Sequence, residues 1–475
     1  MNKLNTLLLS VLLSTPLLLS SSVKADLNLE LPDFNLPQLG GHTGSIAASI
    51  KERETGLDVL RSLRARGLLI EDPEVNLWIR SLGNRLTARA PSSPNPFYFV
   101  VARDTAINAF ATLGGVIVIN SGLILNTSSE SELAAVLSHE IAHVTQRHIP
   151  RMIEKAKNNK FATGAALLAG VIAATKDSQA GGAIINATLA TTAHQQLAFG
   201  REAEAEADRV GLRILASAGL NPQGMPKFLQ KLEEYGDSKT AEIREFLQNH
   251  PLTIKRVSDT SFRASQFGVF KGKENISYQY MREKVRSLAN TTSRAPVSVS
   301  AQIKNYSNIL LLRKQGAFQQ AYNLAEKQLS TKNISEAALY AELAIKQRQY
   351  NKAISILLPL SKIYPGNEVI AIPLSQAYIS LGQIGPAWKI IREIHTTEQT
   401  SLEFFEVLQE LSRLRGNSSY AYRAVAERNI RTSHYQSARI QLTKAMRLPG
   451  SNVNELQEMR QMLDQIKHKK LKKGN

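Results

Sequence analysis

The stretch His139-Glu140-Ile141-Ala142-His143 decides which class of protein this chain belongs to. Residues four apart on an α-helix share a face, so both imidazoles can point at one metal ion with Glu140 beside them. Two neutral imidazoles suit Zn²⁺, and a neighbouring carboxylate can act as the base for a zinc-bound water. The motif therefore predicts one zinc ion per chain and a hydrolytic reaction.

The sequence around the motif predicts a small sheet that leads into a helix. Ser129 and Glu132 have the spacing of a capping box, which places the helix start about ten residues before His139. Short apolar runs at residues 96–101, 108–111 and 116–119 are typical of strands. This is the layout of a zincin peptidase, in which an edge strand could hold a substrate backbone in extended form.

A zinc hydrolase needs a third protein ligand and leaves one position for water. His148 lies nine residues after His139, about half a turn out of phase on one continuous helix. We therefore expect it to point away as a polar or C-terminal helix histidine. The extended motif with a third histidine is absent, because Gln146 and Ile149 stand at its Gly and His positions.

Carboxylates in residues 201–209, a predicted helix, are better candidates for the third ligand. Glu204 and Asp208 are four residues apart and share a face, so one could bind zinc while the other orients a ligand histidine. Spacing alone does not choose Glu204 over Glu202 or Glu206. Without the histidine motif, a solvated, alanine-rich helix face would be the better interpretation.

These features together resemble the gluzincin peptidases of the HtpX and CAAX-protease type, and most closely the periplasmic BepA group of β-barrel assembly-enhancing proteases. The resemblance covers nearly the whole chain after residue 25. The segments that carry it are Asn108-Ala109-Phe110-Ala111, Gly114-Gly115, residues 139–148 and Glu204-x-x-x-Asp208.

The resemblance implies a role for each site residue. His139, His143 and Glu204 would bind zinc, Glu140 would be the catalytic base, and Asp208 would complete the catalytic site from beside a ligand. A further histidine, His250, would occupy the fourth zinc position and exclude the attacking water. It precedes Pro251, which favours a loop after a helix over residues 241–247. A turn histidine with no metal role is the alternative.

The N-terminus predicts export. Residues 1–25 have the pattern of a cleavable signal peptide, with an apolar run from Leu7 to Leu19 and a cleavage site after Ala25. The chain has no cysteine, so it forms no disulfide and has no lipid attachment at that site, which fits the periplasm. No later apolar stretch reaches about 18 residues, which argues against a membrane-embedded peptidase.

One segment and one half of the chain have unusual composition. Residues 161–200 are apolar and rich in Gly and Ala; we favour mobile helices or loops covering the active-site cleft over membrane-surface contact. Residues 26–270 contain 25 basic and 25 acidic residues, whereas residues 271–475 contain 31 and 15, a net charge of +16. Acidic proteins or anionic lipid headgroups, in peripheral contact, are therefore expected partners, and nucleic acid is not.

The basic half predicts helix pairs of the tetratricopeptide type. Ala321, Ala353 and Ala387 recur in aligned turns at intervals of 32 and 34 residues, and Ala438 continues the pattern after about one and a half repeats. Such a solenoid offers a concave surface for protein segments. A plain helical bundle is the alternative.

Together these features predict a mostly α (α+β) fold. A zincin-type metallopeptidase domain with a small sheet would span residues 26–286. A linker at 287–302 would lead to an α-helical repeat domain at 303–475.

The predicted function is a zinc endopeptidase. By resemblance it acts in the periplasm, with a chaperone-like role, on unfolded or stalled outer-membrane β-barrel proteins, and its repeats contact the β-barrel assembly machinery. The alternative is a non-proteolytic repeat chaperone or scaffold whose zinc site is latent or structural. Glu140 argues against that alternative, whereas His250 supports it, because four protein ligands make a closed site.

Overall fold

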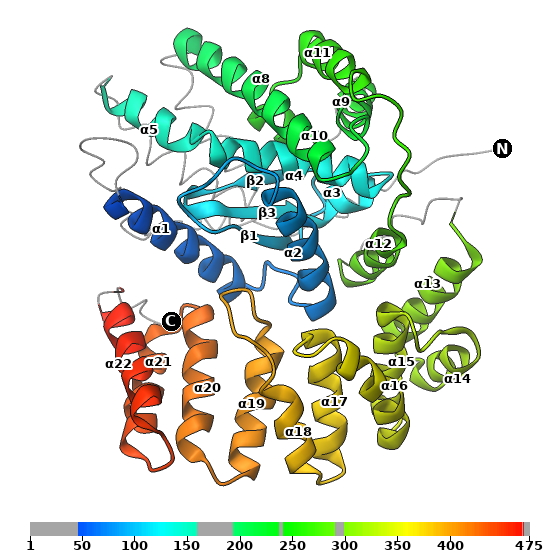
Figure 1. Cartoon of the computed structure of the whole chain (residues 1–475), viewed down its shortest axis with the longest axis vertical. Helices are drawn as coiled ribbons and strands as arrows, with labels where there is room; N and C mark the ends of the chain where they lie inside the picture. The colour runs from blue at the N-terminus through cyan, green and yellow to red at the C-terminus, as the bar shows by residue number, and fades with distance from the viewer. Residues whose placement is uncertain (1–45, 159–192, 237–240, 290–298, 468, 470–475) are drawn as a thin grey trace, which may run out of the picture. The chain divides into compact units, whose positions relative to one another are not determined.

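The computed structural model describes residues 46–158, 193–236, 241–289, 299–467 and 469 (Figure 1). It confirms a mostly helical α+β fold with one small sheet, followed by a helical repeat region. The predicted signal peptide (1–25), most of the apolar segment 161–200 and residues 468 and 470–475 of the basic C-terminal end lie outside the described residues. Among the described helices, none combines the length and apolar character needed to cross a bilayer.

The first part of the fold contains three strands, one 3₁₀ turn and the helices that surround them. In chain order these are α1 (Ile46–Ala65), α2 (Pro73–Thr87), β1 (Tyr98–Ala102), β2 (Ala109–Ala111), η1 (Leu113–Gly115), β3 (Val116–Asn120), α3 (Ser121–Asn126), α4 (Glu130–Thr145), α5 (His148–Asn158), α8 (Ala193–Ser217), α9 (Gly224–Gly236), α10 (Ala241–Asn249), α11 (Ile254–Ser265) and α12 (Ile276–Leu288).

The three predicted strands form one sheet in the order β1-β3-β2. β1 runs parallel to β3, and β2 is antiparallel to it. The turn before β3 depends on glycine: Gly114 and Gly115 have φ of 74° and 82°, and a Cβ on Gly115 would lie 2.3 Å from the carbonyl oxygen of Pro96. The sheet thus has two edge strands, and β2 is the one that packs against α4.

Helix α4 begins at the predicted cap. The Ser129 hydroxyl accepts a hydrogen bond from the Glu132 N–H at 3.2 Å, and the Glu132 carboxylate accepts one from the Ser128 N–H at 2.8 Å. α8 packs closely against α4, because Gly211 has no side chain: a Cβ there would lie 3.0 Å from the backbone nitrogen of His139. This close approach brings the carboxylates of α8 to the histidines of α4.

α12 runs through the predicted domain boundary at residue 286 and packs against α2, α3 and the first repeat helix. Its Lys284 is buried, and the Nζ atom lies 2.6 Å from Glu74 and 3.2 Å from Asp72. Removing one partner of a buried ion pair leaves an uncompensated charge, so these contacts hold α12 firmly to α2. The exact domain boundaries stay a prediction.

Ten helices of the described chain follow α12 and pack successively against one another (Figure 1). They are α13 (Ala301–Lys314), α14 (Phe318–Gln328), α15 (Ile334–Lys346), α16 (Tyr350–Ile363), α17 (Glu368–Ser380), α18 (Ile384–Ile391), α19 (Leu402–Leu414), α20 (Ser418–Arg431), α21 (Tyr435–Arg447) and α22 (Val453–Lys467).

The aligned alanines of the repeats are all fully buried where helices cross, as their small size allows. One turn of this series was not predicted from the sequence. Ala421, at the start of α20, lies 34 residues after Ala387 and five after Gly416, the same spacing as Gly382 to Ala387. The turn did not match the predicted pattern because Ser418 stands where the other turns have Phe, Tyr or Ile.

The loop between α18 and α19 contacts the peptidase part. Gln399 donates a hydrogen bond from Nε2 to the carbonyl oxygen of Phe99 on β1 at 2.8 Å, and Arg61 of α1 binds Glu398 at 2.7 Å. The repeat region therefore covers part of the β1 edge.

The inter-helix turns of the repeats share a left-handed residue. Gly316, Gly382 and Gly416 have φ of 77°, 70° and 73°, and Arg348 and Ser433 occupy the equivalent positions with φ of 58° and 59°. For a residue with a Cβ, this conformation costs about 1–2 kcal/mol. Two turns of the repeat region therefore carry local strain.

Replacing Arg348 with glycine is expected to raise the free energy of unfolding by about 0.5–1 kcal/mol, because strain relief exceeds the added entropy of the unfolded chain. Arg348 is exposed, and no ion pair involves it in the described residues, so little else is lost. The shift in unfolding midpoint measures the effect. Gln347→Gly, at a neighbouring position with φ of −88°, is the control and should not stabilise. Equal shifts for both variants would contradict the strain argument.

Candidate metal centre

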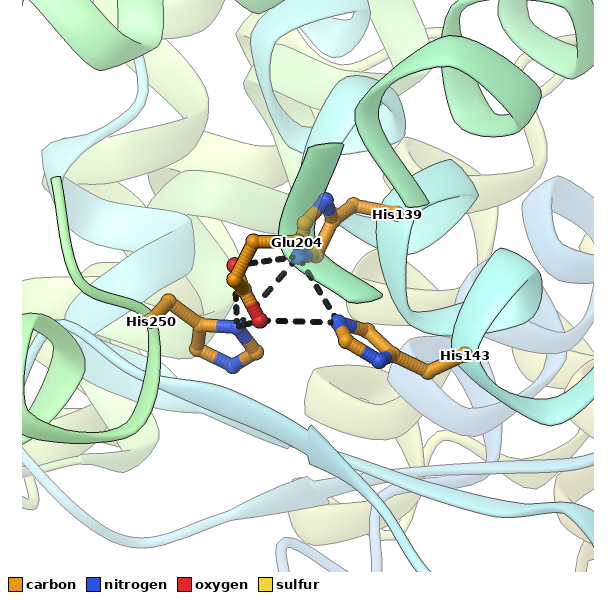
Figure 2. Close-up of side chains that lie close together, drawn as sticks. All are labelled: His139, His143, Glu204 and His250. Atoms are coloured by element: carbon orange, nitrogen blue, oxygen red, sulfur yellow. Dashed lines mark hydrogen bonds and ion pairs between the residues drawn. The ribbon is translucent and has the colours of Figure 1, made fainter. Parts of the chain in front are cut away.

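Four side chains from three parts of the fold converge on one point (Figure 2). His139 and His143 project from the same face of α4, Glu204 comes from α8, and His250 follows the last residue of α10. One ligand atom from each residue can be chosen so that all four lie within 4.8 Å of one another. The structure therefore brings together the four residues that the sequence analysis nominated.

The spacing of the four ligand atoms fits a tetrahedral metal site. Nε2 of His139 lies 3.0 Å from Nε2 of His143, 3.3 Å from Nδ1 of His250 and 3.3 Å from Oε2 of Glu204. Bonds of about 2.0–2.1 Å to a tetrahedral Zn²⁺ would place the ligand atoms about 3.3–3.4 Å apart. Lone pairs at such short separations repel each other unless a cation lies between them, so the donor set suits a metal ion.

The ring nitrogen of His139 that faces away from the cluster, Nδ1, is held by a hydrogen bond. Nδ1 donates to Asp208 at 3.0 Å, which leaves the Nε2 lone pair facing the cluster. Asp208 is itself bound by Arg256 through two hydrogen bonds, of 2.7 and 2.8 Å. Arg256 also lies 2.9 Å from Glu204 and donates to the carbonyl oxygen of Pro251 at 2.9 Å. One buried guanidinium thus connects α8, α11 and the turn that carries His250.

His143 has a different partner, and here one prediction was wrong. α4 ends at Thr145, Arg147 adopts a positive φ of 56°, and His148 begins a new helix instead of pointing away. Its Nδ1 lies 2.8 Å from Nδ1 of His143, and its Nε2 lies 3.1 Å from Glu206. His148 is not part of the cluster, but it orients a member of it.

Glu140 lies beside the cluster with one oxygen held and one directed towards His250. Its Oε2 accepts a hydrogen bond from the Ala111 N–H of β2 at 3.0 Å. Its Oε1 is buried without a hydrogen bond, and Nε2 of His250 lies 3.4 Å from it. A buried carboxylate oxygen without a partner is costly and marks a place where a polar group is missing. Glu140 is thus placed to receive a proton at Oε1.

The charges of the site attract a cation. Burial opposes ionisation of Glu204, but nearby His250 and His139 hold its pKa well below the usual range. Burial also opposes ionisation of Asp208, and hydrogen bonds from Arg256 and His139 lower its pKa. Burial lowers the pKa of His143. For His139 burial acts in the same direction, but Glu204 and Asp208 outweigh it and raise its pKa to about 10. A metal ion would displace the proton that His139 otherwise holds.

Sequence reasoning missed Arg256 and the contacts of His148 with His143 and Glu206. No spacing rule points to Arg256, which lies 52 residues after Glu204. Glu206, which spacing alone had left equivalent to Glu204, projects from another face of α8 towards His148 and Arg151. Which carboxylate faces the histidines is decided by how α8 packs on α4.

Replacing Asp208 with asparagine is expected to weaken metal binding by about 10–100-fold, because the amide cannot stabilise the orientation and basicity of His139 as a carboxylate does. Competition with a chromogenic chelator measures the dissociation constant. Asp259→Asn is the matched control, since Asp259 pairs with Arg263 at the surface of α11. An unchanged dissociation constant in the folded Asp208 variant would exclude this role.

Comparisons with known proteins agree with this site. The model of peptidase family M48 matches residues 73–263. The chain is 32% identical over 399 residues to the beta-barrel assembly-enhancing protease of Yersinia pestis, covering 81% of each chain. It is 31% identical over 405 residues to the protein of the same name from Escherichia coli K12, covering 82% of this chain and 83% of the relative. A putative beta-barrel assembly-enhancing protease of Vibrio cholerae is 40% identical over 253 residues, about half of each chain.

Proposed function

Because this chain belongs to the β-barrel assembly-enhancing proteases and is a metalloendopeptidase of family M48, we propose that it is a zinc enzyme that cleaves outer-membrane β-barrel proteins during their assembly. The observation that carries the proposal is the convergence of His139, His143 and Glu204 beside the proton-accepting Oε1 of Glu140. A purely structural metal site has no need of that carboxylate.

His139, His143 and Glu204 would hold the metal. When bound, the ion would supply Lewis acidity, which stabilises negative charge on oxygen at the scissile peptide. Glu140 would accept the proton of the attacking water at Oε1 and later deliver it to the leaving amine. The Ala111 N–H keeps the carboxylate in the required orientation by holding Oε2. Asp208 and Arg256 keep the His139 imidazole in the tautomer that presents Nε2.

The outer edge of β2 is the proposed binding site for the substrate backbone. Thr112 N–H and Asn108 C=O bond to β3, so in an antiparallel ladder the peptide groups of Ala109 and Ala111 face away from it. The Ala111 N–H binds Glu140, which leaves the peptide groups of Ala109 to pair with an extended peptide next to the metal centre. Ala109 is fully buried in this structure, so such pairing would require the site to open. Unfolded strands of a β-barrel protein are extended peptides of this kind.

His250 is the proposed latch of the enzyme. Its Nδ1 lies 3.2 Å from both oxygens of Glu204, in the fourth ligand position, and its Nε2 faces Glu140 at 3.4 Å. One imidazole would therefore take the position of the attacking water and also lie against Glu140, the base that would activate that water. In this arrangement the enzyme would be self-inhibited until the turn carrying His250 moves.

The family relationship supports the remaining parts of the proposal. We place the enzyme in the periplasm, exported by residues 1–25, where the relatives' name implies a role in β-barrel assembly. The helical repeats, which we assign to the tetratricopeptide type, would bind substrates or the β-barrel assembly machinery and add a chaperone-like role. The second candidate function is a chaperone or scaffold with a closed metal site, which the position of His250 favours.

Metal analysis joined to a cleavage assay tests the proposal. We expect one zinc per chain by elemental analysis, and cleavage of casein and of an unfolded outer-membrane protein that a chelator abolishes and added zinc restores. One zinc without cleavage under any condition, including after loss of His250, would favour the chaperone. A chain without metal would refute the metal centre itself.

A further inference from the structure

Helix α11 lies at the edge of the peptidase part (Figure 1), and a loop over residues 266–275 follows it. Both segments carry exposed large apolar side chains. Ile254 is 78% exposed, Phe262 65%, Phe267 47% and Val269 88%. The other exposed large apolar residues of the described chain are more widely scattered. Single exposed apolar side chains are normal, whereas four large ones within sixteen residues of one helix and its loop make this segment a candidate interaction surface.

Among the residues that the structure describes, no element covers these side chains. The inner face of α11 is buried against α8 and α9 through Val257, Thr260 and Ala264. Ile254 and Phe262 lie on its outer face. In the loop, Gly268 turns the chain with a φ of 74°, so that Phe267 and Val269 both face solvent. We call these four apolar residues, with the lysines described next, the α11 surface.

Positive charge surrounds the apolar group. Lys255, Lys271 and Lys273 are exposed, and no ion pair in the described residues involves them. The two acidic groups on α11 and its loop are already engaged: Asp259 pairs with Arg263 at 2.8 Å, and the Glu274 carboxylate accepts the Ser131 N–H at 3.2 Å. The α11 surface thus combines apolar side chains with three free cations on flexible stems.

This combination fits a lipid surface better than a protein. Lysine is depleted from protein–protein interfaces, because its burial is costly. At a bilayer, by contrast, aromatic and aliphatic side chains enter the headgroup boundary while lysines reach anionic phosphates. We propose that the α11 surface docks onto a phospholipid bilayer with anionic headgroups, and that docking is transmitted through Arg256 to the turn that carries His250.

The transmission has a short structural route. Arg256 follows Lys255 directly but points inward, where it binds Asp208, Glu204 and the carbonyl oxygen of Pro251. Pro251 is the residue after His250. A shift of α11 against α8 would therefore pull on the turn that holds His250 in the cluster. This second part rests on the proposed function, because it assumes that His250 inhibits cleavage.

Vesicle flotation tests the docking, independently of any activity. The full chain should float with vesicles of phosphatidylethanolamine and phosphatidylglycerol, and much less with vesicles of phosphatidylcholine alone. Phe267→Ser and Val269→Ser should each weaken binding by about tenfold, since a buried side chain of this size contributes that factor or more. Lys271→Glu and Lys273→Glu should each weaken it by at least about fivefold.

Matched controls carry the same changes elsewhere. Val453→Ser removes a valine of similar exposure, 78%, from the start of α22, and Lys332→Glu reverses an exposed lysine between α14 and α15. Both should float like the wild type. The docking proposal is overturned if the wild type does not float, which would point to a protein partner for this surface, or if the Phe267 and Val269 variants float as well as the controls.

Casein cleavage with and without the same vesicles tests the transmission. We expect the anionic vesicles to increase cleavage by the wild type severalfold and to have no effect on the Phe267→Ser variant, whose rate without vesicles should be unchanged. Vesicles that bind the wild type but leave its rate unchanged would overturn the link to His250 and leave the docking surface standing. A wild type that floats but never cleaves would count against the proposed function instead.

Discussion

Replacing Glu140 with glutamine is expected to lower kcat/KM for peptide cleavage by about 10²–10⁴-fold while the metal stays bound, the usual contribution of a positioned general base. The amide has the size of the carboxylate, and its oxygen can still accept the Ala111 N–H, so the fold should be retained. It cannot take a proton from water at pH 7. Initial rates on an unfolded outer-membrane protein, with metal content measured on the same samples, give the result.

The matched control is Glu202→Gln, which makes the same chemical change on the exposed face of α8. This control should cleave like the wild type. If the Glu140 variant also kept its rate with metal bound, Glu140 would not be the base. Biological activity that survives in a Glu140 variant without proteolysis would support the chaperone role beside the proteolytic one.

Replacing His250 with alanine is expected to raise basal cleavage by about 10–100-fold. If the latch leaves the open form about 1–10% populated, its removal brings the open form to full occupancy. His139, His143 and Glu204 remain as ligands, so the variant should keep its metal. Initial rates, metal content and self-cleavage of the purified variant measure the effect.

The neighbouring Asn249→Ala is the control, because Asn249 is exposed at the end of α10 and faces no member of the cluster. It should leave the basal rate unchanged. An unchanged or lower rate in a folded, metal-loaded His250 variant would refute the proposal that His250 inhibits cleavage. Loss of the metal from that variant would instead make His250 a structural ligand and favour a closed site. Combining His250→Ala with Glu140→Gln should remove all cleavage, since the released site would lack its base.

Features set by short-range spacing were predictable from the sequence. The buried alanines were predicted from their regular intervals of 32 and 34 residues. The phase of His139 and His143 and the cap at Ser129 depend on residues a few positions apart. Local geometry decides them, and the three strands and the mostly helical fold followed from such signals. Where the local rule was incomplete, as at Ala421, the element was missed.

Helix packing decided what spacing left open. Glu204 and Glu206 are equivalent by pattern, but the contact of Gly211 with His139 sets which face of α8 meets α4, and Glu204 is on it. The break at Arg147 turned His148 back onto His143, against the expectation from one continuous helix. Arg256 joins the site from beyond His250, through contacts that no sequence interval encodes.

The sequence by itself therefore determined the chemistry: a helix with two imidazoles and a carboxylate, suited to a metal hydrolase. Only the tertiary structure decided which groups surround them. It set which carboxylate faces the imidazoles, what orients each imidazole, and that His250 lies against both Glu204 and Glu140. The physical reason is distance along the chain. Residues within a turn of a helix are placed by backbone geometry, whereas groups 46 to 111 residues apart meet only when buried faces pack.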